Sequence, residues 1–252
     1  MKGTAVLLVA GVAAYWWWRY RGPGRTSSYW WWRYRGPGRT SSIPGRGGRI
    51  TGAGASADAH ARELRTPLVR LATAAGIHTR AEARARRFKI GAVGERYVAG
   101  LLEPMIGEGW VFLADRRLPR GKANVDLLGF SPRGLVVVVD PKKWGGSRLT
   151  VRNNRLMHGG KDVSGRLGGM DYEARTVSSL LRVPVVPVAA MVGPMKPGTS
   201  LRFRGIRLVP AEDVPELLRA LDRKYRPTVP AAQLVAAAQR LLPPKTGRKT
   251  VR

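Results

Sequence analysis

The strongest limit on the fold of this chain is a pair of short apolar runs separated by four residues with turn-forming chemistry. Val125–Phe130 and Leu135–Val139 flank Ser131–Gly134, which reads Ser-Pro-Arg-Gly. Proline suits the second position of a type I turn, and glycine suits the left-handed position that follows. Such a turn commonly carries a G1 bulge. The segment is therefore predicted to be a β-hairpin.

The bulged turn also sets the register of the hairpin and so places its polar residues. Asp126 then lies directly opposite Asp140, and Asn124 lies opposite Lys142. A shorter hairpin loop would instead place Val139 opposite Asp126. Two carboxylates that face each other across a strand pair repel one another, and sheets normally avoid this arrangement. A divalent cation between them would remove the repulsion.

The residue types in this hairpin favour metal-dependent hydrolysis of phosphodiester bonds. Carboxylate oxygens suit Mg²⁺ or Mn²⁺, which keep several waters and bind substrate phosphate oxygens. Lys142 comes two residues after Asp140, so strand alternation points both side chains to the same face. Its ammonium could orient or help deprotonate the attacking water, or offset charge on the phosphate, while the metal acts as a Lewis acid.

A further acid is predicted to come from the preceding helix. The stretch from about Ala81 to Leu102 has helical spacing and carries Glu95 on its apolar face. The small residues Gly91 and Gly94 would let this helix approach the sheet closely and bring the Glu95 carboxylate near the two aspartates. The alternative is a solvated glutamate at the edge of the apolar stripe.

Several stretches resemble the nuclease-related domain (NERD), a branch of the PD-(D/E)xK nuclease-like superfamily. They are GAVGERYVAGLL at 91–102, NVDLLGF at 124–130, GLVVVVDPKKWGG at 134–146 and, more loosely, NNRLMHGG at 153–160. The resemblance implies an α/β, restriction-endonuclease-like core with a mixed β-sheet flanked by helices. We place this nuclease domain at 57–242.

Carried over position by position, the resemblance assigns four site residues. Glu95 is the helix acid, Asp126 the metal-binding aspartate, Asp140 the acid of the (D/E)xK motif and Lys142 its lysine. The three acids would bind Mg²⁺ or Mn²⁺, and the partner would be nucleic acid, DNA in preference to RNA. We therefore expect a metal-dependent nuclease. The alternative is a non-catalytic protein that keeps the fold and binds nucleic acid or a membrane surface.

Two departures from the family pattern bear on activity. Asp140 stands where the family more often has glutamate, so its carboxylate lies closer to the backbone. Pro141 occupies the middle position of the motif, where it removes a backbone donor and marks a strand edge or end.

The charge balance favours a polyanionic partner. The 252 residues contain 45 Lys and Arg against 16 Asp and Glu, a formal net charge of +29. Such an excess gives salt-dependent affinity for phosphate backbones, and equally for anionic membranes. The absence of cysteine excludes disulfides and Cys-ligated zinc. The histidines His60, His78 and His158 are scattered and form no metal-ligand pair.

The N-terminus, 1–20, is predicted to be a hydrophobic membrane anchor. Gly3–Trp18 is uncharged but slightly short for a bilayer core of about 30 Å. Tryptophan and tyrosine prefer the interface, and the arginines that follow outweigh Lys2, which places the nuclease domain in the cytoplasm. The alternatives are a cleaved signal peptide, a soluble extension of a cytoplasmic protein, or a misassigned start.

Between the anchor and the domain lies an identical tandem repeat. Tyr15–Ser28, YWWWRYRGPGRTSS, is copied without change in Tyr29–Ser42. Its aromatic and arginine side chains could stack on bases or lie at lipid headgroups, and a tolerated duplication in a flexible arm is the alternative. Residues 43–56 are predicted to be a Gly/Ser-rich linker, and 243–252 a disordered basic tail.

The remainder of the core is predicted from apolar periodicity. Asp171–Leu181 is predicted to be a helix that crosses to a buried strand at Val183–Val192, and Leu201–Val209 an edge strand. Ala211–Leu221 and Ala231–Leu242 are predicted to be helices separated by a proline-containing turn.

Overall fold

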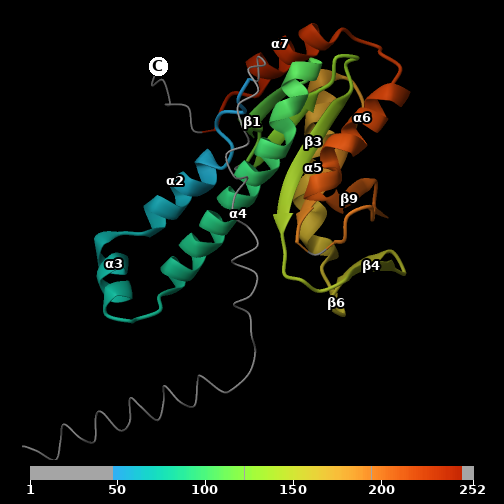
Figure 1. Ribbon diagram of the computed structural model, residues 1–252. Coiled ribbons are helices and arrows are strands. Elements are labelled where there is room, and N and C mark those ends of the chain that lie inside the picture. The colour runs from blue at the N-terminus through green and yellow to red at the C-terminus, as the bar shows by residue number, and fades with distance from the viewer. Residues whose placement is uncertain (1–47, 122, 194, 246–252) are drawn as a thin grey trace, which may run out of the picture. The chain divides into compact units, whose positions relative to one another are not determined.

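The computed structural model describes residues 48–121, 123–193 and 195–245 (Figure 1). These all belong to one unit, Gly45–Arg252. The predicted anchor at 1–20 and the tandem repeat at 15–42 lie outside the described residues, so the membrane-anchored, cytoplasmic placement stays a prediction. Among the helices of the described part, none combines the length and the hydropathy needed to cross a bilayer.

The core is a six-stranded mixed sheet in the order β1-β2-β3-β7-β9-β8. The β3–β7 and β7–β9 pairs are parallel and the others are antiparallel. A second, three-stranded sheet has the order β4-β5-β6. The strands are β1 (Val111–Arg117), β2 (Asn124–Phe130), β3 (Val136–Lys143), β4 (Leu149–Arg152), β5 (Arg155–His158), β6 (Lys161–Asp162), β7 (Val185–Val192), β8 (Leu201–Phe203) and β9 (Ile206–Pro210).

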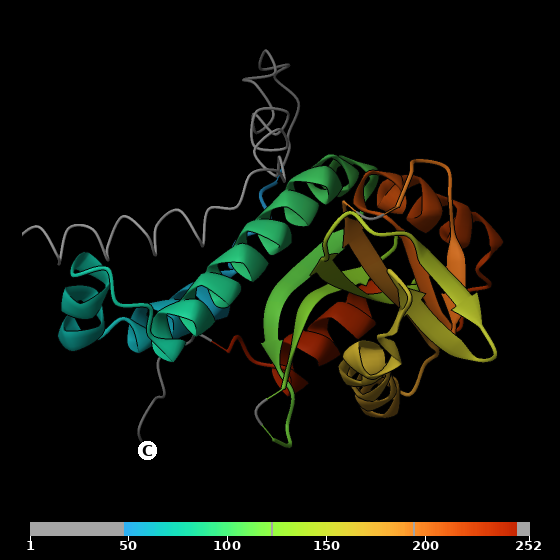
Figure 2. The same cartoon turned by 90° about the horizontal axis from the view of Figure 1, so that it is seen from below.

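Helices cover both faces of the six-stranded sheet (Figure 2). One buried cluster joins α4 and α6 to one face, and a second joins α5 and α7 to the other. The predicted mixed sheet flanked by helices is therefore confirmed. The helices are α2 (Ala55–Leu64), α3 (Pro67–Ala74), α4 (Arg80–Leu102), η1 (Glu103–Glu108), η2 (Ser164–Leu167), α5 (Gly168–Leu181), η3 (Ala211–Asp213), α6 (Val214–Lys224) and α7 (Ala231–Leu241).

The predicted hairpin forms between β2 and β3. Ser131 N–H donates to Leu135 O at 2.9 Å, and Gly134 N–H donates to Ser131 O at 3.0 Å. Gly134 has φ 83°, the left-handed conformation expected of a bulge glycine. The turn chemistry of the sequence therefore fixes how the two strands are paired.

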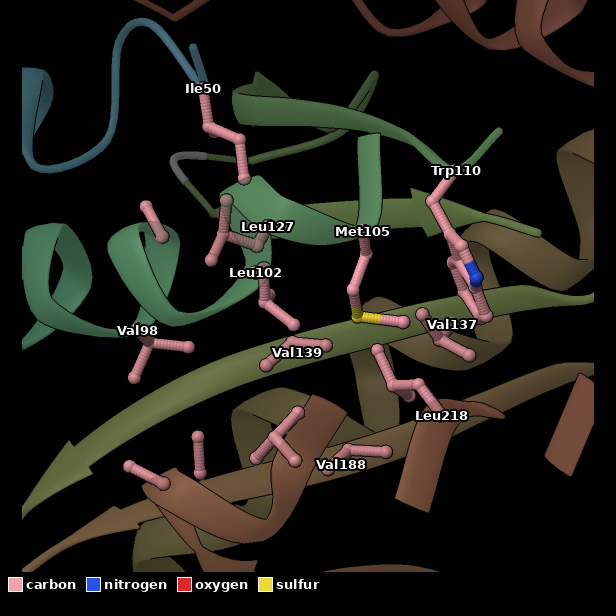
Figure 3. Packing of buried hydrophobic residues seen from close by; sticks show 14 of the residues in the cluster. Ile50, Val98, Leu102, Met105, Trp110, Leu127, Val137, Val139, Val188 and Leu218 are labelled. Atoms are coloured by element: carbon pink, nitrogen blue, oxygen red, sulfur yellow. The ribbon is translucent and has the colours of Figure 1, made fainter. Parts of the chain in front are cut away.

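Helix α4 packs its apolar face on the centre of the sheet (Figure 3). Val98 and Leu102 are fully buried there against Val139. Each such side chain contributes on the order of 1.5–3 kcal/mol on burial. A Cβ at Gly94 would lie 3.9 Å from Pro141 Cβ, whereas one at Gly91 would meet nothing within 4 Å. The close approach predicted for both glycines thus occurs at Gly94 alone.

The C-terminal half differs from the prediction in one strand and one helix start. The predicted strand Leu201–Val209 is a hairpin, because Arg204 and Gly205 turn the chain with φ 48° and 81°. Its first strand, β8, is the sheet edge and β9 is internal. The helix predicted from Ala211 opens with η3, and α6 then carries Pro215 in its first turn, where a missing N–H is tolerated.

Both segments predicted to be unstructured contribute residues to the domain. Within the predicted linker 43–56, Ile50 is 7% exposed and belongs to the main core. Within the predicted tail 243–252, Arg117 N–H donates to Pro243 O at 2.9 Å. The tail pairs here because β1 is an edge strand with unpaired backbone groups. The sequence analysis also did not predict α2, α3, η1, η2, β1 or the small sheet.

Candidate active site

Two aspartates lie side by side where β2 and β3 separate. Leu127 pairs with Val139, which confirms the predicted bulged register and excludes the shorter loop. The next pair in this register is Asp126 and Asp140, and the ladder ends just before it. From Asp140 onward β3 pairs with β7 but no longer with β2. Pro141 lies in this half-paired stretch, where a missing N–H donor is tolerated.

A third aspartate extends this row to β1. The β1–β2 ladder is interrupted between Ala114 and Arg116, where Asp115 stands beside Asp126. Asp115 has φ 50°, which is uncommon outside glycine, although aspartate is among the residues that adopt it most readily. Asp115, Asp126 and Asp140 thus form a row across three neighbouring strands, at a level where strand pairing is interrupted. We call these three residues the aspartate row.

An amide bridges two members of the aspartate row. Asn124 Nδ2 donates to Asp115 Oδ1 at 3.0 Å and to Asp126 Oδ1 at 3.2 Å. The ammonium of Lys245 donates to Asn124 Oδ1 at 2.7 Å. The other oxygen of Asp115, Oδ2, is buried and has no hydrogen-bond partner within the described residues.

Lys142 contacts the end of the aspartate row. Its Nζ lies 2.5 Å from Asp140 Oδ2, and its side chain is 23% exposed. Burial lowers the pKa of Lys142, but the charges of Asp140, Asp126 and Glu173 and the bond to Asp140 outweigh it, so the pKa is raised. Lys142 is therefore an ammonium donor here. Of the roles considered for it, orienting water and offsetting phosphate charge fit this state, and removing a proton does not.

Glu95 reaches the site from α4 and is 7% exposed, which excludes the solvated alternative. Its Oε2 accepts the Gly54 N–H at 2.9 Å. Burial raises the pKa of Glu95, as do the charges of Asp115 and Asp140, and the Gly54 bond opposes them.

Glu173 is a site residue that the sequence analysis did not identify. It reaches Asp140 from α5, the layer opposite α4, and burial together with the Asp140 charge raises its pKa to about 8. Glu173 lies three residues after Met170 and four before Val177, both buried in α5. An acid at those steps is the same signal that singled out Glu95.

Burial raises the pKa of four carboxyls of the site, namely Glu95, Asp126, Asp140 and Glu173. Burial raises the pKa of Asp126 well above its usual range, and the charges of Asp140, Glu95 and Glu173 raise it further. Burial also raises the pKa of Asp140, against the opposing effects of Lys142 and of a hydrogen bond with Asp126. Five of the 16 acidic residues thus meet at one place.

The donor chemistry of this cluster fits a hard divalent cation. It offers carboxylate oxygens, which such a cation prefers, and among the described residues Asp115 Oδ2 has no hydrogen-bond partner. Asp126, Asp140 and Glu95 are the residues that would hold the ion. In the described residues, no three Asp, Glu or His side chains are already spaced to hold a metal, and Lys142 contacts the Asp140 oxygen.

Trp144 and His158 form a small ring cluster next to the motif. The Arg166 guanidinium lies 5.5 Å from the Trp144 ring centroid, and the His158 ring lies 5.6 Å from it. His158 Nε2 also bonds Gly145 O at 3.0 Å. His158 therefore secures the loop after β3 and is no part of the acid cluster.

Helices on the two faces of the sheet each bring a glutamate to the aspartate row and Lys142. Together with the hairpin, these features define a nuclease-like α/β domain. Residues 90–192 match the family model of the nuclease-related domain, NERD, which indicates a nuclease-related function. The match runs from α4 to the end of β7. Comparisons with curated proteins and with solved structures found no match.

Proposed function

We propose that this protein hydrolyses phosphodiester bonds of nucleic acid, DNA in preference to RNA, with Mg²⁺ or Mn²⁺ as cofactor. The observation that supports this most directly is the aspartate row with Lys142 at its end. Asp126 and Asp140 sit where β2 and β3 part, and a hydrogen bond joins their side chains. Carboxylates whose pKa is raised by burial are typical of functional sites.

The roles of the side chains follow from their charges and donors. Asp126, Asp140 and Glu95 supply the cation's oxygen ligands. Lys142 has three N–H donors, one of which faces Asp140, and the others can serve a phosphate oxygen or the attacking water. When bound, the metal supplies Lewis-acid activation of the phosphate and lowers the pKa of a bound water.

The surroundings of the site are suited to a polyanion. A cluster of five carboxyls repels phosphate, so a substrate needs cations both within the site and around it. The small sheet that follows Lys143 carries exposed cations, namely Arg148, Arg152, Arg155 and Lys161. Such groups add affinity for the phosphate backbone without reading sequence.

The test is a cleavage assay of the full chain. Single- and double-stranded DNA and RNA are incubated at several salt concentrations with Mg²⁺, Mn²⁺ or EDTA. Asp140→Asn and Lys142→Ala are compared with Glu63→Gln, which removes an exposed carboxylate from α2, away from the small sheet.

We expect metal-dependent cleavage that falls at least about 100-fold in both site variants, beyond the 10- to 100-fold typical of outer-shell partners. The control variant should cleave like the wild type. Salt-sensitive binding with no cleavage under any metal would instead identify a non-catalytic nucleic-acid-binding domain.

A further inference from the structure

The C-terminal segment, residues 243–245, pairs with β1 at the edge of the sheet. Arg117 N–H donates to Pro243 O at 2.9 Å, and Lys245 N–H donates to Asp115 O at 2.8 Å. The Arg117 guanidinium also donates to Lys245 O at 3.1 Å. These contacts hold the backbone of Lys245 against the strand that carries the first member of the aspartate row, outside the segment 90–192 that matches the family.

The Lys245 side chain turns from this position into the site. Its ammonium donates to Asn124 Oδ1, and Asn124 Nδ2 donates to Asp115 and Asp126. An ammonium has only donors and an ionised carboxylate only acceptors. The amide can therefore satisfy all three neighbours in one orientation alone, with its oxygen toward Lys245 and its nitrogen toward the aspartates.

Lys245 also balances charge on the side of the site away from the motif lysine. Lys142 comes from β3 and Lys245 from the added segment, and the charges of both lower the pKa of Glu173. The cluster of acids is thus held between two ammonium groups that are far apart in the chain. One of them belongs to the D-x-K motif, and the other has no place in it.

We propose that Lys245 is a positioning residue of the active site. It fixes the orientation of the Asn124 amide and, through it, the Asp126 carboxylate that would bind the cation. The functional unit therefore extends beyond the family segment to the C-terminal residues that pair with β1. This inference rests on the proposed nuclease function, and its test separates the two.

The side chain and the segment can be tested independently in the full chain. Lys245→Ala leaves the backbone bonds of the pairing in place, whereas a stop after Leu242 removes them. Lys245→Arg keeps the charge, and Lys249→Ala removes the same charge from the same tail outside the described residues. The readouts are kcat and KM for cleavage, the Mn²⁺ dissociation constant by calorimetry, and the Tm in EDTA.

We expect Lys245→Ala to lower kcat about 10- to 100-fold and to weaken Mn²⁺ binding, as loss of an outer-shell partner does. KM and Tm should stay near the wild-type values, and Lys245→Arg should recover part of kcat. Lys249→Ala should match the wild type. Unchanged kcat and Mn²⁺ affinity in Lys245→Ala, or equal effects of Lys245→Ala and Lys249→Ala on KM alone, would overturn the proposal.

A double-mutant cycle tests whether Lys245 acts through Asn124. If it does, Lys245→Ala should have little further effect on kcat or Mn²⁺ affinity in an Asn124→Ala background. Additive effects would overturn the positioning role.

The calorimetry keeps this inference separate from the proposed function. If the wild type cleaves nothing, the nuclease proposal fails, but weaker Mn²⁺ binding by Lys245→Ala still supports the positioning role. If the wild type cleaves and Lys245→Ala cleaves equally well, only the role of Lys245 fails. If the wild type neither cleaves nor binds Mn²⁺, both proposals are overturned.

Discussion

Helix α4 carries two buried glutamates whose pKa values shift in opposite directions. Glu82 is 8% exposed and Glu95 is 7% exposed. Arg65 donates to both oxygens of Glu82 at 2.9 and 2.8 Å, Arg86 donates at 3.2 Å, and these bonds lower the pKa of Glu82. Glu95 accepts one backbone N–H, from Gly54, and its pKa is raised.

Burial therefore does not by itself set the direction in which the pKa of these glutamates shifts. The balance of partners does. Around Glu82 the arginines neutralise the carboxylate and join α4 to the chain before it. Around Glu95 lie further acids, and Asp115 Oδ2 has no hydrogen-bond partner in the part of the chain that the structure describes. A cluster of acids without neutralising partners lowers the stability of a fold, and such a cluster is expected where a function depends on it.

The largest difference between the two glutamates should appear in catalysis. Glu95→Gln should lower cleavage at least about 100-fold, because it removes a charged ligand of the cation. Glu82→Gln should stay within about twofold of the wild type, since its partners are distant from the aspartate row. Steady-state cleavage rates measure this, and a comparable loss in both variants would remove the distinction.

The next largest effect should be a change with pH in the free energy of unfolding of the metal-free protein. The folded pKa of Glu173, about 8, lies above the ordinary value of 4.5. The folded state therefore binds more protons than the unfolded state between these values, and its extra stability is present at low pH and lost as pH rises through about 8.

Urea unfolding in EDTA from pH 5 to 9 should show the free energy of unfolding falling, by at most about 1.4 kcal/mol per pH unit for one such group. Glu173→Gln should flatten this slope. A slope that Glu173→Gln leaves unchanged would show that other carboxyls carry the effect.

A smaller effect is expected on thermal stability, with opposite signs at the two positions. At pH 8 in EDTA, Glu82→Gln should lower Tm because it breaks the bidentate bond with Arg65. Glu95→Gln should raise Tm because it removes a charge from a repelling cluster. Glu63→Gln, at an exposed position of α2, is the control and should leave Tm unchanged. Equal signs at Glu82 and Glu95 would contradict this account.

The smallest effect concerns how closely α4 approaches the sheet beside Glu95. A Cβ at Gly94 would lie 3.8 Å from Lys143 Cβ, an ordinary contact, and one at Gly91 would meet nothing within 4 Å. Gly91→Ala and Gly94→Ala should each stabilise the helix by up to about 1 kcal/mol. Urea unfolding measures both, and destabilisation by Gly94→Ala alone would reveal a tighter approach than the structure shows.

The hairpin and its register could be predicted because local chemistry determines them. The turn residues Ser131–Gly134 require a bulge, and strand alternation then brings Asp126, Asp140 and Lys142 together. Glu95 could be placed because an acid on an apolar helix face is unusual. These signals all lie within short stretches of the chain.

The remaining site residues depend on long-range packing. Asp115 joins the row only because β1 pairs with β2 and because its own φ is positive. Glu173 carries the same local signal as Glu95, but only the packing of α5 on the sheet brings it near Asp140. Lys245 depends on an edge strand that accepts the C-terminal segment, and its own sequence, PPK, reads as a simple basic tail. Ile50 lies in a stretch with the composition of a linker, and its burial likewise depends on packing against distant parts of the chain.

The bond between Gly54 and Glu95 has a consequence for mutational robustness. Its donor is a main-chain N–H, so replacing a side chain cannot delete it, whereas one substitution at Arg65 abolishes the main partner of Glu82. Gly54 has φ 76°, and a Cβ there would lie 2.8 Å from Ala92 O. Selection at this position therefore acts on the absence of a side chain, and the bond that Glu95 accepts is insensitive to most side-chain replacements around it.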